Sequence, residues 1–519
     1  GRTQSHRQKQ TEVCNRARRL ISSRADKELS AVDKIRQLKA LSTCYLAKLD
    51  NLCAFSPMAA NISTRDAWLM DPHLVDPVIG VRRLLYLVTP AETTFEAVNS
   101  VPNLIDESVP YFLLLIGLEY AILTLKGRNK SMPINDSLIS LTMGIFSQLP
   151  LLFTRSVEVS VYLWIWENCR LVDIPVESTL AWFATLMGVD FCFYWVHRAT
   201  HEVNLIWASH QVHHSSERFN LTTALRQPVL QRYLVWILYT PLALILPPQL
   251  FATHLQLNMI YQFWIHTETI PKLPEPIEFV FNTPSHHRVH HGRNAYCIDR
   301  NYGGVFILFD RLFGTFRAER DNEPPVFGLV TPESQFDPLS LQLDHLKQLA
   351  QSVRLPYLSW TDRLKLLVYG PSWQPGTAAR LGPGIYPEIR YPVRPLNPRV
   401  PSWTTAYATV HFIAALAGYG FLTAHRSQPL LLLVGCAVIV WALTGVARTL
   451  EDRVGLELTA KRELLRCSVT AAVCALMQPW LCAISRSLLI ALYSASAAMW
   501  LGLGTQSCFL ALASSEKIY

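Results

Sequence analysis

The stretch that decides the fold runs from Asp190 to His291 and holds three histidine clusters. It opens with DFCFYWVHRATHE (residues 190–202), continues with HQVHH (210–214) and closes with SHHRVHH (285–291). Most of the 16 histidines of the chain lie within it. Side chains three and four positions apart share one face of a helix, so each cluster can direct its imidazoles at one point. Imidazole is the commonest metal-binding side chain, and the stretch therefore predicts a metal site.

The composition favours an integral membrane protein. Of the 519 residues 50% are hydrophobic and 17% are charged, and the mean hydropathy is +0.18. That charged share is well below the roughly 25% of soluble domains. The formal net charge of +8 is spread along loops, as on loops that face anionic lipid or simply water. No nucleic-acid motif accompanies it, and the unpaired spacing of the 11 cysteines fits a reducing cytosol.

Apolar runs flank the histidine clusters on both sides. They cover residues 111–125, 138–153 with 157–166, 180–195, 229–265, 406–423, 429–446, 464–483 and 487–503. Run 180–195 leads directly into the first histidines, and run 229–265 is broken by prolines, so it could be a hairpin or two short spans. A helix needs about 20 residues to cross the hydrocarbon core. We predict an all-α, polytopic membrane protein with a histidine-rich two-metal site facing the cytosol.

The distribution of apolar and polar residues divides the chain into four regions. We expect a polar, basic and disordered extension at 1–75, a catalytic membrane region at 76–318, a cytosolic Pro/Gly-rich cap at 319–401 and C-terminal transmembrane helices at 402–519.

Four side chains of the first cluster fall on one helical face. Asp190, Tyr194, His197 and His201 are spaced at i, i+4, i+7 and i+11. A metal-bound imidazole usually donates its other N–H to an oxygen, and Asp190 is placed to be that acceptor. Glu202 points about 100° away from His201 on an ideal helix. We expect it either behind the ligands or reaching the site from the side.

The number of imidazoles favours two metals. The candidates are His197, His201, His210, His213, His214, His266, His287, His290 and His291. One metal with an open position needs three to five protein ligands, so nine suit two ions. The competing interpretations are a pH-sensing polar loop set and a membrane zinc protein. The motif HxxxHE at 197–202 differs from the HExxH of zinc peptidases, which weakens the second.

These motifs resemble a known superfamily. HRATH (197–201), HQVHH and HHRVHH, in this order between apolar runs, are similar to the fatty acid hydroxylase superfamily of membrane di-iron oxygenases. The segment NYGGVFILFDRLFGTF (301–316) resembles the one that closes the site in that superfamily. WASHQVHHSSERFNLTTALRQ (207–227) and WIHTE (264–268) are most similar to its ether-lipid branch.

The resemblance implies a reaction and its components. A monooxygenase would use dioxygen and tetrahydrobiopterin to hydroxylate the ether-bearing carbon of a 1-O-alkylglycerol, which then yields a fatty aldehyde and glycerol or a glycerol derivative. Two iron ions would be held by the nine histidines, His266 being the ninth, and Glu202 matches a position needed for activity. The resemblance also implies the endoplasmic reticulum membrane, with the site on the cytosolic side. A sterol or sphingolipid oxidase of the same superfamily is the alternative, and no motif indicates the pterin contacts.

Overall fold

A computed structural model describes residues 75–154, 157–332, 335–425, 428–451, 455–477, 481 and 483–515. The expected extension at 1–75 lies outside these residues, apart from Val75. Within the described ranges the secondary structure is helical, with two isolated bridges, Phe281–Phe306 and Gly292–Phe327, in place of strands. The all-α prediction is confirmed.

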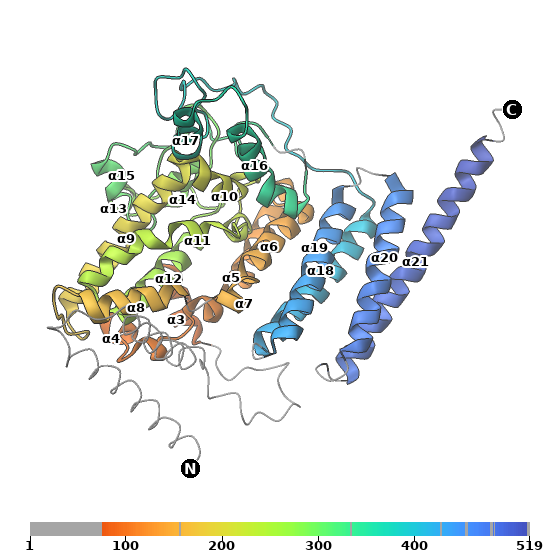
Figure 1. Ribbon diagram of the computed structural model, residues 1–519, viewed down its shortest axis with the longest axis horizontal. Helices are drawn as coiled ribbons and strands as arrows, with labels where there is room; N and C mark the ends of the chain where they lie inside the picture. The colour runs from red at the N-terminus through yellow and green to blue at the C-terminus, as the bar shows by residue number, and fades with distance from the viewer. Residues whose placement is uncertain are drawn as a thin grey trace, which may run out of the picture.

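Helices of the N-terminal part surround the histidine stretch (Figure 1). They are α3 (Pro77–Leu84), α4 (Pro90–Thr93), α5 (Leu104–Leu125), α6 (Ile134–Gln148), α7 (Leu151–Thr154), α8 (Val157–Cys169), α9 (Thr179–Glu202), α10 (Asn204–His214), α11 (Gln231–Val235), α12 (Pro248–Trp264), α13 (Glu275–Val280), α14 (Pro284–His290) and α15 (Leu308–Leu312). Short 3-10 turns join them: η2 (Val98–Ser100), η3 (Asn129–Ser131), η4 (Thr223–Leu225) and η5 (Trp236–Leu244).

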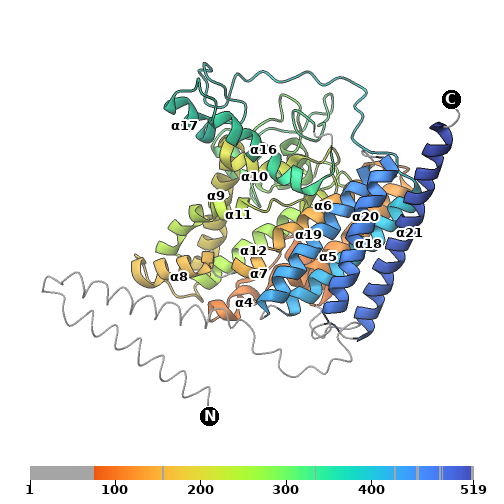
Figure 2. The same cartoon turned by 45° about the vertical axis from the view of Figure 1, so that its right-hand side comes forward.

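The C-terminal part adds a cap and a bundle. Two helices, α16 (Pro338–Val353) and α17 (Trp360–Val368), belong to the segment 319–401, which we call the cap segment. Four longer helices then stand side by side in both views (Figures 1 and 2): α18 (Ser402–Ala424), α19 (Pro429–Glu451), α20 (Gly455–Leu476) and α21 (Ala483–Ser515).

Six helical segments of the described residues are long and apolar enough to cross a membrane. They are Val98–Leu125, Ile134–Thr154, Thr179–Glu202, Ser402–Ala424, Pro429–Glu451 and Ala483–Gln506. The polytopic prediction is confirmed. Run 229–265 instead folds as α11, η5 and the 17-residue α12, and no part of it qualifies as a span. Its prolines divide it into pieces shorter than the hydrocarbon thickness requires.

Most of the described part of the apolar run 464–483 belongs to a longer helix. This helix, α20, begins at Gly455, and its first twelve residues include the charged residues Glu457, Lys461, Arg462, Glu463 and Arg466. These charges keep α20 out of the candidate spans, although it packs between α19 and α21.

An ion pair buried in the C-terminal bundle accounts for two of those charges. The guanidinium of Arg466 donates from Nε to Glu463 (2.9 Å) and from Nη2 to Tyr407 on α18 (2.9 Å). Arg466 and Glu463 are 1% and 3% exposed. Because both charges are out of water, each depends on the other for solvation.

The helix α9 has two different faces. Ser178 caps its N-terminus by accepting from the Ala181 amide. Along one side the exposed residues Leu180, Phe183, Met187, Phe191 and Trp195 form a stripe at helical spacing, which we call the α9 stripe. A neighbouring face is buried and carries Asp190, Tyr194, His197 and His201. The sequence therefore directs an apolar face to lipid and the polar face inward.

The cap segment is tied to the corner between α9 and α10. The amide of Asn204, the first residue of α10, donates to the Tyr369 carbonyl (2.8 Å), and its side chain donates to the Leu366 carbonyl (2.9 Å). His345 of α16 contacts the side-chain oxygen of Asn204 (2.7 Å). The helices α16 and α17 consequently lie against α10, as Figures 1 and 2 show.

Replacing Glu463 with Gln tests the buried ion pair. The substitution leaves the charge of Arg466 uncompensated in the bundle, so we expect unfolding free energy to fall by about 3–5 kcal/mol. Thermal or denaturant unfolding in lipid nanodiscs measures the change. The matched control is Glu457→Gln on the same helix, whose side chain is 56% exposed and pairs with Lys461. Equal stability of the two variants would contradict the role of the pair.

Candidate metal centre

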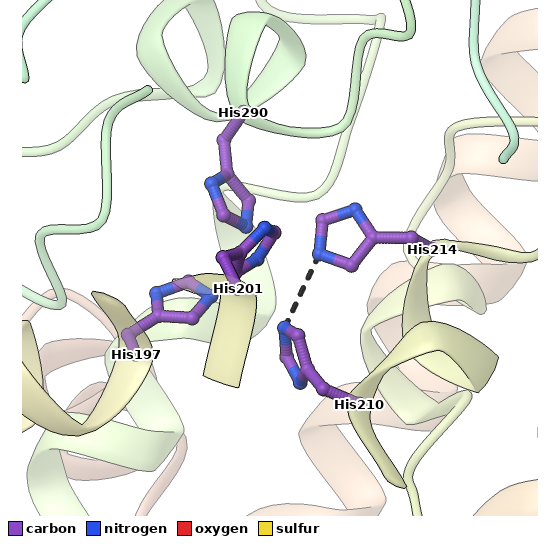
Figure 3. A group of neighbouring side chains, drawn as sticks. All are labelled: His197, His201, His210, His214 and His290. Atoms are coloured by element: carbon purple, nitrogen blue, oxygen red, sulfur yellow. Dashed lines mark hydrogen bonds between the residues drawn. The ribbon is translucent and has the colours of Figure 1, made fainter. Parts of the chain in front are cut away.

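All nine predicted histidines converge, and they do so in two groups. Group one contains His197, His201, His210, His214 and His290, and group two contains His213, His266, His287 and His291. Within each group the candidate ligand nitrogens lie within 4.8 Å of one another, and every member is buried. Figure 3 shows the rings of group one turned toward a common point from α9, α10 and α14. Both groups are drawn from the residues that the structure describes.

The two groups share elements. The sequence HQVHH places His210 and His214 one turn apart on α10 and leaves His213 beside them on a different face. The motif HHRVHH likewise sends His290 to group one, while His287 and His291 go to group two. Each HxxHH cluster therefore supplies both groups, and the turn that follows α12 adds His266 to group two.

Five of the nine imidazoles have Nδ1 within hydrogen-bonding distance of an oxygen. Those pairs are His197 with the Tyr302 carbonyl (2.9 Å), His210 with Gln231 Oε1 (2.7 Å), His213 with the Arg226 carbonyl (3.1 Å), His266 with the Gln262 carbonyl (2.7 Å) and His290 with the Arg300 carbonyl (2.9 Å). Carbonyl oxygens only accept, so Nδ1 must carry the proton in these rings. The Nε2 lone pair is thereby turned toward the group, as in metal-binding histidines.

The arrangement of group two favours a bound cation. His213 and His266 both donate from Nδ1 to carbonyls, and their Nε2 atoms lie 3.3 Å apart. Burial lowers the pKa of His213 to about 4 and that of His266 well below its usual value, so both rings are neutral at pH 7. Two lone pairs then face each other at hydrogen-bonding distance. A metal ion between them converts this repulsion into two bonds.

The imidazoles of group one also favour a bound metal ion. The Nε2 atoms of His201 and His290 are buried and have no hydrogen-bond partner in the described part of the chain. Burial and the neighbouring imidazoles lower the pKa of His210, His214 and His290 well below the usual value. Neutral, buried and unpartnered nitrogens carry a desolvation cost that a bound metal would offset. The residues thus fit two metal ions.

A short loop orients the imidazoles of group one. The carbonyls of Arg300 and Tyr302 accept from His290 and His197, respectively, and we call residues 299–306 the orienting loop. Asp299 and Asn301 are non-glycine residues with φ of 56° and 57°. Left-handed backbone costs free energy at such residues, so the loop depends on outside contacts to keep its shape.

Side chains supply those contacts. Asn301 accepts from the Arg317 amide (2.8 Å) and donates to the carbonyls of His286 (3.0 Å) and Arg317 (2.7 Å). The carboxylate of Asp310 accepts from the amides of Tyr302 (2.8 Å) and Gly303 (2.7 Å). Polar side chains therefore fix residues 301–303 of the loop.

Asp190 acts on this loop and not directly on a ligand. Its carboxylate accepts from the amides of Val305 (2.8 Å) and Phe306 (2.9 Å) and from the Asn258 side chain (2.7 Å). The prediction that it accepts from an imidazole is wrong, because the Tyr302 carbonyl takes that place at His197. A Cβ at Gly304 would come within 2.6 Å of Asp190 Oδ1, so this close approach requires glycine.

Glu202 is paired with arginines and lies behind the ligands. It accepts from Arg198 Nε (2.8 Å) on α9 and from Arg380 of the cap segment. Arg380 also donates to the Glu202 main-chain carbonyl (3.1 Å). Glu202 thus joins the helix that carries His201 to the cap segment, which is the first of the two positions considered for it.

The structure adds residues that the sequence pattern did not single out. Gln231 and the carbonyls at 226, 262, 300 and 302 orient imidazoles, and Asp299 lies 3.7 Å from His201 Nδ1. A main-chain acceptor leaves no signature in the residue types, and the signal that could have drawn attention to this loop is the adjacent pair Gly303–Gly304. His286 stays outside both groups and pairs with Glu278 (2.8 Å).

Comparison with known proteins agrees with this site. The sequence model of the fatty acid hydroxylase family matches residues 182–315, the stretch that holds both histidine groups. The chain is 44% identical over 402 residues to the alkylglycerol monooxygenase of Homo sapiens, covering 75% of this chain and 86% of that protein. It is 41% identical to the enzymes of the same name from Xenopus tropicalis and Danio rerio, with the same coverage. No solved structure matches significantly.

A helical membrane fold with a buried histidine centre of this kind defines a membrane monooxygenase of the fatty acid hydroxylase class. Within that class the chain belongs to the alkylglycerol monooxygenase family.

Replacing Asp190 with Asn tests the orienting loop. The amide would place a donor against the Phe306 or Val305 N–H, so the loop and the carbonyl at 302 should shift. We expect the affinity of group one for metal to fall roughly 10–100-fold, as when groups behind metal ligands are lost. Titration of the metal-depleted protein with Fe²⁺ measures it. Asp173→Asn, at a side chain that is 82% exposed, is the control, and unchanged affinity in Asp190→Asn would refute the role.

Proposed function

We propose that this protein cleaves the ether bond of 1-O-alkylglycerols by hydroxylating the carbon that bears the ether oxygen, using dioxygen and tetrahydrobiopterin. The observation that carries the proposal is the pair of buried histidine groups within a chain similar over most of its length to alkylglycerol monooxygenases. The proposed ligands are the five imidazoles of group one and the four of group two, each group holding one iron ion.

The donor set suits the proposed chemistry. Both groups offer neutral imidazole nitrogens and no carboxylate among their members. Neutral ligands leave the full charge of a divalent ion uncompensated, and imidazole suits iron among other transition metals. Iron would supply the dioxygen activation that breaking the C–H bond beside the ether oxygen demands, with the pterin as electron source.

The chain itself would place the substrate. An alkylglycerol is amphipathic, so its alkyl chain can lie among the membrane helices while the ether carbon stays near the interface. The α9 stripe offers an apolar surface, and the same helix carries His197 and His201 at its far end. The helix thus leads from the lipid to the histidine groups, and a substrate aligned along it would reach them with its polar end.

Burial of the site would protect the reaction. The histidines of both groups are 1–6% exposed, and the cap segment is anchored beside them through Glu202 and Arg380. Exclusion of water prevents side reactions of the oxidant. Glu202 and Asp190 are proposed as positioning residues in this account. Hydroxylation gives a hemiacetal, whose C–O bond breaks as its hydroxyl proton is lost and the glycerol oxygen is protonated.

The proposal includes a localisation, which the family resemblance implies. We place the protein in the endoplasmic reticulum membrane with the histidine groups and the cap segment on the cytosolic side. The sequence KGRNK at 126–130, which follows the first candidate span, supports a cytosolic end there.

An assay of membranes that contain the protein tests the proposal. With a long-chain 1-O-alkylglycerol, fatty aldehyde should form only when both dioxygen and tetrahydrobiopterin are supplied. The matched control is the 1-O-acylglycerol of equal chain length, whose acyl carbon, the counterpart of the carbon that is hydroxylated, carries no hydrogen, so it should give no fatty aldehyde. Hydroxylation of a sterol or sphingolipid with cytochrome b5 as donor would contradict the proposal, as would a zinc-only protein that consumes no dioxygen.

His213→Ala tests group two as a metal site. It removes one of four donors, so we expect iron to fall from two ions per chain toward one and turnover to drop at least about 100-fold, while the protein still inserts into the membrane. His425→Ala is the control, because His425 lies at the end of α18 and bonds the Phe421 carbonyl (2.9 Å). Full activity of His213→Ala would remove that residue from the ligand set.

A further inference from the structure

A patch of exposed apolar side chains lies on α13 and α15, two helices of six and five residues that are too short to cross a membrane. Its members are Ile277, Phe279, Phe281, Leu312 and Phe313, and we call them the aromatic platform. Phe279 and Leu312 are 56% and 71% exposed. Contiguous apolar patches of this kind mark surfaces that bind a partner or a membrane.

The two helices of the platform are joined to each other. Arg311 of α15 donates from Nε to the Phe279 carbonyl (3.1 Å), and its guanidinium lies over the rings of Phe279 (4.7 Å) and Phe316 (3.7 Å). The Ile307 amide donates to the Val280 carbonyl (3.0 Å). Main-chain and cation–π contacts thus hold the platform together as one surface.

The platform continues the α9 stripe. The ring centroid of Phe313 lies 5.1 Å from that of Trp195 and 6.4 Å from that of Phe191, and Phe191 also contacts Phe309 of α15 (5.4 Å). The helices α13 and α15 accordingly lie beside α9 (Figure 1). Because the α9 stripe belongs to a candidate span and faces lipid, the platform borders the same lipid.

The position of Trp195 along α9 gives the depth of the platform. Trp195 comes 16 positions after Thr179, the first residue of α9, which is about 24 Å along the axis at about 1.5 Å per residue. The hydrocarbon core is about 30 Å thick, so Trp195 lies near its far boundary. Arg198 lies over the Trp195 ring (5.4 Å), a pairing of aromatic ring and cation that suits the membrane–water interface.

The inner side of the platform supports group one. Phe313 stacks on Tyr194 (5.3 Å), Tyr194 contacts Tyr302 (6.1 Å), and Tyr302 contacts His197 (5.9 Å), all between ring centroids. Two buried rings, those of Tyr194 and Tyr302, therefore lie between Phe313 and His197. Asp310 of α15 also accepts from the Tyr302 amide (2.8 Å). The same short helix thus faces lipid on one side and the orienting loop on the other.

We propose that the aromatic platform is an interfacial membrane anchor, whose apolar side chains insert among the phospholipid acyl chains of the leaflet nearest the histidine groups while Arg311 stays at the level of the headgroups. Phospholipid is the occupant because the platform continues a lipid-facing helix and carries a cation stacked on its own aromatic rings. The anchor holds group one at a fixed height relative to the bilayer. It requires no particular substrate, so it stands apart from the proposed function.

Photo-labelling of the iron-loaded protein in phosphatidylcholine nanodiscs tests the anchor. One lipid carries a carbene precursor near the carboxyl end of its acyl chain, and a second lipid carries it at the methyl end. Mass spectrometry should find adducts of the first lipid at residues 277–281 and 309–313. The second lipid should label the middle of the α9 stripe, around Phe183 and Met187, more than the platform. Residues around Lys347 of α16, whose side chain is 61% exposed, should carry no adduct from either lipid.

Leu312→Asp tests the platform by substitution. A carboxylate among acyl chains is costly, so most adducts at the platform should be lost, while adducts on the α9 stripe and the iron content stay unchanged. The matched control is Ile385→Asp, at an 81% exposed aliphatic side chain of the cap segment, which should leave the platform adducts in place.

Two results would overturn the anchor. The first is a platform without lipid adducts in wild-type protein whose α9 stripe is labelled, which would place the platform in water. The second is a cross-link from the platform to another copy of the chain in place of lipid adducts, which would assign the surface to a dimer. Failure of the aldehyde assay would overturn the proposed function alone, because the labelling needs no turnover.

Discussion

The structure depends on nine imidazoles that are buried and packed against one another. Hydrogen bonds from Nδ1 to fixed oxygens turn the Nε2 lone pairs inward, and between His213 and His266 those lone pairs are 3.3 Å apart. Such an arrangement stores repulsion unless a cation occupies the space. The surrounding helices therefore favour metal binding, because the folding that buries the rings leaves several of their nitrogens without a partner among the described residues.

Support for this arrangement comes from residues that do not belong to either group. Asp190 links three parts of it: it accepts from the orienting loop, it accepts from Asn258, and Asn258 accepts from Gln262, whose carbonyl orients His266. In group two, Arg226 has a linking role like that of Asp190. Its carbonyl accepts from His213, while its buried guanidinium donates to Asp136 (2.6 Å) and Ser140 (3.1 Å) on α6. The two sites are thus coupled through the helices that support them.

The sequence predicted the imidazoles but not what orients them. Spacing at i, i+3 and i+4 places neighbouring rings on one side of a helix, but the prediction that each HxxHH cluster points at one site is wrong, because each cluster divides its rings between the two groups. The acceptors at 300 and 302 are main-chain carbonyls, which any residue provides. Glu202 and Arg380 are far apart in the chain, and no local pattern joins them. The same limit applies to Asp190, whose helical position was predicted correctly and whose partner was not.

Some membrane helices could likewise be predicted from the sequence and others could not. Long apolar runs such as 429–446 were recognisable because hydropathy alone decides them. In α20 the sequence signal was ambiguous, because Arg466 is neutralised within the helix by Glu463 and also contacts Tyr407 on α18, which the sequence of α20 alone does not reveal.

Metal content tests the central claim most directly. Protein produced with ample iron and purified in lipid should contain two iron ions per chain, and X-ray absorption should show nitrogen ligands around both. One metal ion per chain, or a first shell dominated by oxygen, would contradict the account of two histidine-bound ions.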